Sequence, residues 1–282
     1  MKYDKPSQTA WGVAAICLGL SVDRSHPGLV TQDYAETLAH LMRATGEMSR
    51  FSVRFFQTPI GLMLLRRVSD KSLPGQFQQF GKRKKYFEAQ ARDAIVVGAK
   101  QVLVLGAGYD VLCLRMAREF TDVTFLEIDH PATARAKKLG LDSLGTPSNL
   151  KQIPVDLADT PLQEVLSEED QWDETACSFV VAEGLTQYLR EDVVKNLFET
   201  IDSNTGKASR FGFTFIGWRE QENRPEAGPF TDKFLRSVAK RGEPWIWGMA
   251  VSGISDFFAG TPWKLIEDVE VAGIEYFACV GK

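Results

Sequence analysis

The fold of this chain is decided by residues 102–110, which read Val-Leu-Val-Leu-Gly-Ala-Gly-Tyr-Asp. Val102–Leu105 is a short, uninterrupted apolar run, which is typical of a parallel strand buried on both faces. Gly106 and Gly108 follow it directly, and glycines allow a ligand to approach the backbone closely. Residues 111–120 then carry a helical pattern. The stretch therefore predicts a strand, a glycine-rich turn and a helix, the unit that forms ligand sites in open α/β sheets.

The alternation of strand and helix continues toward the C-terminus. Apolar runs predict further strands at 123–128, 178–182 and 210–218, and helical patterns occupy 131–141 and 189–201. Residues 263–269 and 274–280 are expected to form a closing antiparallel pair. Together these patterns predict an α/β fold, with a mostly parallel sheet and helices on both faces.

Two regions lie outside this alternation. Residues 1–88 lack strong strand signals and have helical spacing at 35–45 and 60–68, so we expect an N-terminal helical extension, or lid. Residues 219–260 hold three prolines and several glycines, and we expect an inserted cap over the strand ends. A long surface loop is the plainer alternative for that segment. Residues 89–282 then form the core, and the whole chain one compact domain.

Composition argues against several classes of protein. The chain has 282 residues and a net charge of −4, which disfavours a nucleic-acid binder with a broad basic field. Its four cysteines form no CxxC pair and its three histidines no HExxH pattern, so we expect no metal site. No run approaches the ~20 apolar residues of a membrane helix. We expect a cytoplasmic monomer or homodimer with no nucleic-acid or membrane partner.

The glycine turn indicates which ligand it accepts. A dinucleotide-binding turn has a third glycine at position 111, where this chain has Val111, and the Lys-Ser/Thr of a phosphate-binding loop is absent. Asp110 would repel a phosphate but suits a cationic amino group. These features favour a ligand with a positive end and no phosphate, such as S-adenosylmethionine.

Acidic residues follow three other predicted strands. Glu127 and Asp129 lie about twenty residues after the turn, where a carboxylate commonly accepts hydrogen bonds from ribose hydroxyls. Asp156 and Glu183 come directly after apolar runs. Because parallel strands end at one edge of the sheet, we expect these carboxylates to border a common cleft. Solvated carboxylates at strand ends are the alternative.

Three segments resemble the leucine carboxyl methyltransferase superfamily, which includes bacterial O-methyltransferases of the tetracenomycin polyketide type. They are LGAGYD (105–110), FLEIDHPAT (125–133) and AEGLTQYL (182–189). SQTAWGVAA (7–15) and RKKYF (83–87) are looser matches. The chain departs from the bacterial members at Ile16-Cys17, where they more usually have Arg-Ala.

The resemblance implies a Rossmann-like class I methyltransferase fold with a seven-stranded sheet, and S-adenosylmethionine as cofactor with S-adenosylhomocysteine as product. It implies a role for each matching residue. Gly106, Ala107 and Gly108 would line the cofactor, Arg83 would hold its carboxylate and Glu183 its amino group. Asp129, or alternatively Glu127, would bind the ribose, and Asp156 with Leu157 would flank the adenine. Tyr188 would face the acceptor and is the candidate catalytic residue.

Residues of the inserted segment are candidates for the acceptor pocket. Its aromatic candidates are Trp218, Phe230, Trp245 and Trp247, and ordinary core packing is the alternative for each. Arg219 and Arg224 are candidates to pair with an acceptor carboxylate, although such residues are more often solvated. The charged run at 82–85 is interpreted, apart from Arg83, as a solvated helix face.

We therefore predict an S-adenosylmethionine-dependent O-methyltransferase that acts on a carboxylate or phenolic oxygen of a small molecule. No convincing general base is visible, since His130 is expected to be structural, and this favours an acceptor that is already ionised. A protein C-terminal carboxyl methyltransferase is the alternative. An NAD-dependent oxidoreductase is disfavoured by Val111, and a non-catalytic module by the intact turn.

Overall fold

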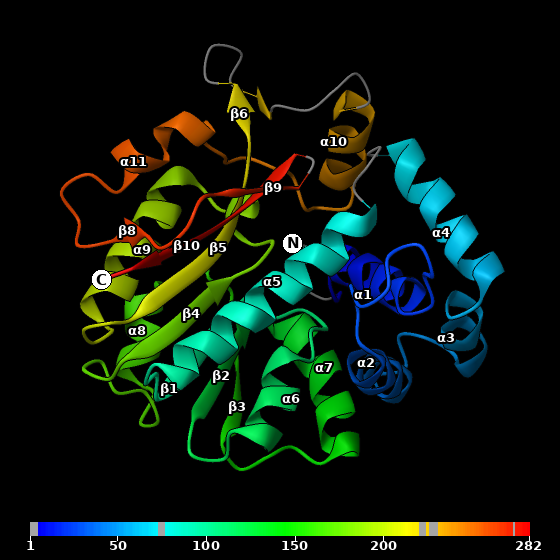
Figure 1. Ribbon diagram of the computed structural model, residues 1–282, viewed down its shortest axis with the longest axis horizontal. Helices are drawn as coiled ribbons and strands as arrows, with labels where there is room; N and C mark the ends of the chain where they lie inside the picture. The colour runs from blue at the N-terminus through cyan, green and yellow to red at the C-terminus, as the bar shows by residue number, and fades with distance from the viewer. Residues whose placement is uncertain (1–4, 73–76, 220–223, 226–230, 273) are drawn as a thin grey trace.

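The computed structural model describes residues 5–72, 77–219, 224–225, 231–272 and 274–282. Figure 1 shows a central twisted sheet with helices on both faces and a group of N-terminal helices beside it. Along the sheet the strands are β3 (Leu150–Pro154), β2 (Thr124–Asp129), β1 (Gln101–Leu105), β4 (Ser178–Ala182), β5 (Arg210–Ile216), β10 (Glu275–Gly281) and β8 (Lys264–Leu265).

The pairing within the sheet confirms the predicted α/β class. β3, β2, β1, β4 and β5 are parallel, while β10 is antiparallel to β5. β8 pairs antiparallel with β10, as expected for the closing pair, and β9 (Glu270–Ala272) also pairs with β10. β6 (Trp218–Arg219) and β7 (Arg224–Pro225) form a separate two-stranded ladder.

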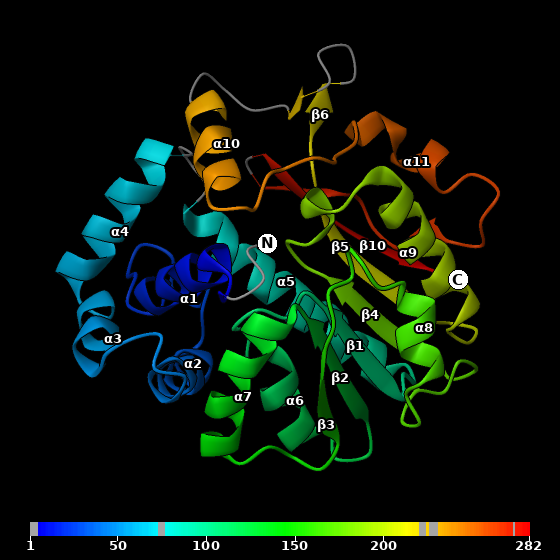
Figure 2. The ribbon, with the colours of Figure 1, turned by 180° about the vertical axis from the view of Figure 1, so that it is seen from behind.

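Alternating side chains of each central strand enter two different cores. In β1, Val102 and Val104 belong to the core on the α5 side, whereas Leu103 and Leu105 belong to the core on the other side. This follows from the two-residue period of a strand. The apolar run of β1 is uninterrupted because both of its faces are covered, as Figures 1 and 2 show from opposite sides.

The helices follow the predicted pattern. Those that connect or cover the strands are α5 (Phe77–Val96), α6 (Leu112–Glu119), α7 (Pro131–Leu144), α8 (Leu162–Ser167), α9 (Glu191–Ser203) and α11 (Ile254–Phe257), with short 3-10 turns at Thr186–Tyr188 and Val251–Gly253. α5 packs on β4 and β5, and α8 and α9 lie on the opposite face. Pro131 occupies the first turn of α7, where its missing N–H costs nothing.

The N-terminal region is helical, as predicted. It consists of α1 (Gln8–Leu20), α2 (Gln32–Ala44), α3 (Arg50–Phe56) and α4 (Pro59–Ser72). Because α5 runs from Phe77 to Val96, the predicted boundary at 88/89 falls inside one helix, and the division of the chain into extension and core stays a prediction. The predicted cap contributes α10 (Thr231–Lys240), which lies near α4. Among the described residues, no helix is both long and apolar enough to cross a membrane.

Candidate cofactor and acceptor site

A cavity of about 750 Å³ lies at the carboxyl ends of β1, β2 and β4. One wall is the glycine turn after β1 and the residues that end the neighbouring strands. The other walls come from α1, α2, α4, α5 and α10, and from the residues that follow α10. The cavity therefore joins the strand ends, where ligands of open α/β sheets bind, to the N-terminal helices and the cap.

The glycine turn has a backbone that few other residues adopt. Gly106 and Gly108 have φ angles of +69° and +52°, in the left-handed region that favours glycine. A Cβ at Gly106 would lie 3.1 Å from Leu185, and one at Gly108 would lie 3.2 Å from Ala10. Both glycines line the cavity together with Ala107. A side chain at either position would therefore strain the backbone and crowd these neighbours at the wall of the cavity.

Asp129 ends β2 beside this turn. Its carboxylate accepts hydrogen bonds from the backbone N–H of Gly108 at 2.5 Å and from that of His130 at 2.6 Å. Burial raises the pKa of Asp129 from its ordinary 3.8 to about 6, although these two hydrogen bonds oppose the shift. Asp129 lines the cavity, and each oxygen retains a lone pair for a hydroxyl donor.

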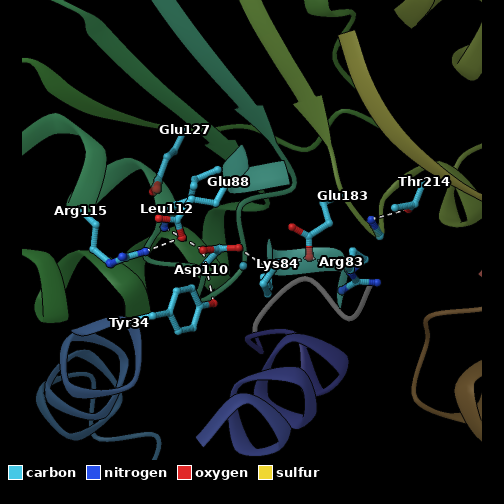
Figure 3. A network of polar contacts seen from close by, with 12 residues as sticks. Tyr34, Arg83, Lys84, Glu88, Asp110, Leu112, Arg115, Glu127, Glu183 and Thr214 are labelled. Carbon is cyan, nitrogen blue, oxygen red and sulfur yellow. Dashed lines mark hydrogen bonds and ion pairs between the residues drawn. The ribbon is translucent and has the colours of Figure 1, made fainter. Parts of the chain in front are cut away.

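A network of charged side chains borders the same cavity. Figure 3 shows four of its members, Arg83, Lys84, Asp110 and Glu183, near the ends of the strands. Lys84 lies between Asp110 and Glu183, with Nζ 2.6 Å from Glu183 Oε1. Arg83 donates from Nε to the same Glu183 oxygen at 2.7 Å. Its Nη1 donates to Glu275 on β10 at 2.8 Å. The network therefore holds two cations and three carboxylates at one end of the cavity.

The pKa values within this network shift as expected for buried ion pairs. Burial alone would lower the pKa of Arg83, but Glu275 and Glu183 outweigh it and raise that pKa. Burial opposes the ionised form of Asp110 as well, yet Lys84 holds the pKa of that carboxyl below its ordinary value. Arg83 and Asp110 are therefore charged at neutral pH. The cavity thus places cationic side chains beside acidic ones, an arrangement that suits a zwitterionic ligand.

The expected cofactor-binding residues separate into two sets. Eight of them line the cavity: Arg83, Gly106, Ala107, Gly108, Asp110, Asp129, Asp156 and Glu183. Glu127 and Leu157 do not. Glu127 lies 2.8 Å from Lys137 of α7, and both side chains are buried. Leu157 packs in the core on the α8 and α9 side. Of the two candidates for the ribose, the structure brings only Asp129 to the cavity.

The acceptor-side residues separate in the same way. Tyr188 and Trp245 line the cavity, and Trp245 packs edge-on against Phe234 of α10 with ring centroids 4.9 Å apart. Trp247 is buried in the core against Phe257, which is the packing alternative stated above. Trp218 and Arg219 form β6 and, like Arg224 of β7, do not line the cavity. Phe230 lies outside the described residues.

The N-terminal end of α1 closes over the cavity. Ser7 caps α1 by accepting from the N–H of Ala10, and its hydroxyl donates to Glu243 Oε1 at 2.6 Å. Thr9 donates to the other oxygen of Glu243. Ser7, Thr9 and Glu243 all line the cavity. These bonds connect the residues at the start of α1 to the segment that follows α10.

Several residues of the site are absent from the sequence prediction. Lys84 was assigned to a solvated helix face, and the structure corrects this: Lys82 and Lys85 are exposed, whereas Arg83 and Lys84 turn inward. The acidic residues predicted at neighbouring strand ends, Asp110 and Glu183, were the sequence signal that could have indicated a buried cation. Glu275 and Glu243 stand in segments without a recognisable motif. His130 has the structural role expected of it, because its ring accepts from the N–H of Ala132 at the start of α7.

The cavity suits S-adenosylmethionine. The turn presents only small residues to the cavity. Asp129 offers acceptors for ribose hydroxyls, and the charged network suits the α-amino and α-carboxylate groups of the methionine part. The cavity volume is within the usual range of small-molecule sites. No cluster of three or more candidate metal ligands occurs in the part of the chain that the structure describes.

Comparison with known proteins agrees with this geometry. Residues 12–202 match the family described as leucine carboxyl methyltransferase, which is more than half of the chain. The chain belongs to the leucine carboxyl methyltransferase family. It is a methyltransferase that uses S-adenosylmethionine, and the expected class I fold is confirmed.

Individual relatives are distant. A protein of Mycobacterium ulcerans, described as a candidate S-adenosyl-L-methionine-dependent methyltransferase, is 27% identical over 242 residues, covering 83% of this chain and 77% of its own. The solved structure of a candidate methyltransferase from Thermobifida fusca is similar with a TM-score of 0.59 at 16% identity, covering 86% and 94% of the two chains. The solved structure of a Streptomyces avermitilis protein described as a DUF574 family protein is similar with a TM-score of 0.55 at 15% identity, covering 89% and 98% of the two chains. At these identities the two structures support the fold alone.

Proposed function

We propose that this methyltransferase transfers a methyl group to an oxygen atom, a carboxylate or an acidic phenolate, of a small apolar acceptor. The proposal rests on the continuity of the cavity. One end contains the glycine turn and the charged network, and the other is a chamber lined by α1, α4 and α10. Side chains of that chamber are largely apolar, among them Leu65, Phe234, Val238 and Trp245. Such a lining suits an organic molecule with a hydrophobic body.

The donor half of the proposed reaction uses the strand ends. S-adenosylmethionine supplies an electrophilic methyl group on a sulfonium. We assign Asp129 to its ribose hydroxyls, Arg83 to its carboxylate, and Glu183 to its amino group. These residues contribute by holding the donor in one orientation, since in-line displacement depends on the alignment of the reacting atoms. Binding the amino acid part then requires the Arg83–Glu183 pair to separate or to share its hydrogen bonds with the ligand.

The acceptor half contains no obvious general base. The described residues that line the cavity include no histidine. Burial raises the pKa of Tyr188 above its ordinary 10, so this phenol stays protonated and can donate a hydrogen bond but not remove a proton. An acceptor oxygen that is already ionised needs no base. Lys71, Lys233 and Arg241, which also line the cavity, would favour such an anionic acceptor.

A test of this proposal is transfer of labelled methyl from S-adenosylmethionine to a panel of aryl and alkyl carboxylates, acidic phenols, amines, and a peptide with a free C-terminal carboxylate. Labelled products are then treated with alkali, which hydrolyses methyl esters and leaves aryl methyl ethers intact. We expect an ester or ether of a small acceptor. Exclusive methylation of nitrogen or carbon would overturn O-methyl transfer, and exclusive methylation of the peptide would overturn the small-molecule acceptor.

A further inference from the structure

Helices α3 and α4 present apolar side chains to solvent. Phe51 of α3 is 78% exposed, and on α4 Ile60 is 62%, Met63 45%, Leu64 42% and Val68 66% exposed. Ile60, Met63 and Leu64 are spaced by three residues and one residue, which places them along one face of the helix, whereas Val68 also lines the cavity. We name Ile60, Met63 and Leu64 the outer stripe of α4. Large apolar side chains gathered on one surface, rather than scattered singly, mark an interaction site.

The outer stripe is not needed to hold α4 in the fold. The opposite face of the helix does that: Gly61 is buried against the backbone of Phe55, and Leu62 and Leu65 pack against the core beside Gly19 of α1. A Cβ at Gly61 would lie 2.0 Å from the carbonyl oxygen of Phe55, so the contact between the two helices is close. Packing of α4 within the fold therefore does not account for the apolar side chains of Ile60, Met63 and Leu64, which are exposed.

The same two helices concentrate positive charge. Residues 50–72 contain five basic side chains and one acidic side chain, in a chain whose net charge is −4. Arg66 pairs with Asp23 at 2.7 Å. The other basic residues are all exposed and form no ion pair within the described residues: Arg50, Arg54, Arg67 and Lys71. Arg67 belongs to the same face of α4 as the outer stripe, whereas Lys71 lies at the end of the helix and lines the cavity. This face is therefore both apolar and cationic.

The combination indicates an anionic, apolar partner. Figures 1 and 2 place α3 and α4 at the outer edge of the molecule, away from the sheet. A helix pair that protrudes can meet a flat, fluid surface, and its cationic side chains match anionic headgroups. A second copy of this face would bring like charges together. We propose that the face formed by α3 and the outer stripe of α4 binds the surface of an anionic phospholipid bilayer.

This mode of binding agrees with the physics of peripheral proteins. Apolar side chains enter the boundary between headgroups and acyl chains, while arginine and lysine contact anionic headgroups. It requires no helix that crosses the membrane. The proposal replaces the expectation that no membrane takes part, because that expectation rested on the lack of a long apolar run and such a run is not a feature of an interfacial helix.

The surface adjoins the cavity. Leu65, Val68, Ser69 and Lys71 of α4 line the cavity, so the helix that would lie on the bilayer is also a cavity wall. An acceptor with an apolar body could then move from the bilayer to the chamber without crossing water. This consequence rests on the function proposed above, whereas the lipid-binding surface does not depend on it.

The test is co-sedimentation of the purified full chain with vesicles of phosphatidylcholine alone and of phosphatidylcholine mixed with phosphatidylglycerol. We expect binding to the mixed vesicles, weakened by salt, and little binding to phosphatidylcholine. I60S/M63S/L64S and R50E/R54E/R67E should each lower the bound fraction about tenfold or more. The matched control is V96S/L139S, which replaces two exposed apolar residues on α5 and α7. Circular dichroism and S-adenosylmethionine affinity should be unchanged in the folded variants.

Other outcomes would overturn the proposal. One is the absence of wild-type sedimentation with either vesicle, and another is an equal loss of binding in V96S/L139S. Light scattering provides the remaining test, because it measures the oligomeric state. If the wild-type protein is a dimer that binds no lipid, and I60S/M63S/L64S is a monomer, the face binds a second copy of the chain. If the wild-type protein binds the mixed vesicles but methylates no acceptor of the panel, the result would contradict the proposed function and support the lipid-binding surface.

Discussion

Arg83 of α5 and Glu275 of β10 are joined inside the protein, although 192 residues separate them in the sequence. Nη1 of Arg83 lies 2.8 Å from each carboxylate oxygen of Glu275. Gln79 donates to the same carboxylate at 2.8 Å, one helical turn before Arg83. Glu275 thus fixes the guanidinium at the wall of the cavity, while the Nε of Arg83 contacts Glu183.

Replacement of Glu275 by Gln should therefore weaken cofactor binding through Arg83. Glutamine has a single acceptor oxygen and no charge, so the guanidinium loses its orientation and turns toward Glu183. We expect the KM for S-adenosylmethionine to rise about tenfold, with a smaller change in kcat, because the acceptor side is untouched. Steady-state kinetics at saturating acceptor measures both. E267Q, at an exposed glutamate, is the matched control; an equal change in KM and kcat would argue for a merely structural role of Glu275.

The raised pKa of Asp129 predicts how cofactor binding depends on pH. Ribose hydroxyls donate to the ionised carboxylate, and the pKa of this group is about 6. Affinity for S-adenosylmethionine should therefore be constant above about pH 7 and fall as the pH is lowered through about 6. Calorimetric titration between about pH 5 and pH 8 measures this. D129N should bind more weakly and lose the transition near pH 6; a transition that persists in D129N would assign it to another group.

The contribution of Asp129 to the stability of the fold changes with pH in the opposite direction to its contribution to cofactor binding. Its pKa is raised in the folded protein above the ordinary 3.8, so the folded state retains the proton over a range in which the unfolded chain has lost it. The contribution of this carboxyl to the free energy of unfolding is then largest below about pH 4 and decreases as the pH rises through about 6. Bound cofactor should offset that loss, since it binds the folded state alone.

Gly108 should tolerate no large side chain in the cofactor-bound protein. Its φ of +52° and the 3.2 Å approach of a Cβ to Ala10 leave the new side chain only the cavity to occupy. G108R should abolish S-adenosylmethionine binding in calorimetry and keep the circular dichroism of the wild type. G145R is the matched control, because Gly145 also has a positive φ, +76°, but a Cβ there meets nothing within 4 Å. Normal cofactor affinity in G108R would remove the turn from the site.

Much of this fold could be predicted from the sequence because the deciding signals are local. The uninterrupted run of β1, the two glycines after it and the helical pattern that follows lie within twenty residues. Those signals specify burial on both faces and a bend that only glycine adopts readily. The pairing of β8 with β10 could also be expected, because two short apolar runs near the C-terminus favour neighbouring strands.

The parts of the site that could not be predicted depend on contacts between distant segments. The run at 82–85 contains four basic residues, of which two face the cavity and two face solvent. Sequence alone did not distinguish them, because the acidic partners Asp110, Glu183 and Glu275 come from three other elements. Glu243 is a similar case, since its contacts with Ser7 and Thr9 join the two sides of the cavity.

The contacts of Glu243 predict that it holds α1 in place beside the cavity. Removing its carboxylate in E243A leaves the hydroxyls of Ser7 and Thr9 without their acceptor. Amide hydrogens of residues 8–20 should then exchange faster, and the KM for the acceptor should rise several-fold because α1 lines the cavity. Hydrogen exchange with peptide resolution measures the first effect. E199A, at an exposed glutamate of α9, should change neither the exchange rates nor the KM. Unchanged exchange in E243A would show that α1 is held by its apolar contacts.

Glu127 and Asp129 point to the same side of β2, and two variants should separate their roles. Glu127 is buried against Lys137 at 2.8 Å, and burial raises its pKa while Lys137 opposes the shift. K137A leaves a buried carboxylate without its partner, which typically costs about 3–5 kcal/mol of stability. We therefore expect K137A to unfold at lower denaturant concentration, and E127Q to do so to a smaller extent, with the cofactor affinity of the folded fraction preserved.

D129N should show the reverse: weak cofactor binding with near-normal stability, because the asparagine side chain still accepts one of the two backbone hydrogen bonds. Urea unfolding and calorimetry on the three variants measure both properties. If E127Q loses cofactor affinity as strongly as D129N, the ribose must contact Glu127, which would require α7 and Lys137 to move away from the strand. If only D129N loses cofactor affinity, Asp129 makes the ribose contact, and Glu127 stabilises the packing of α7 through Lys137.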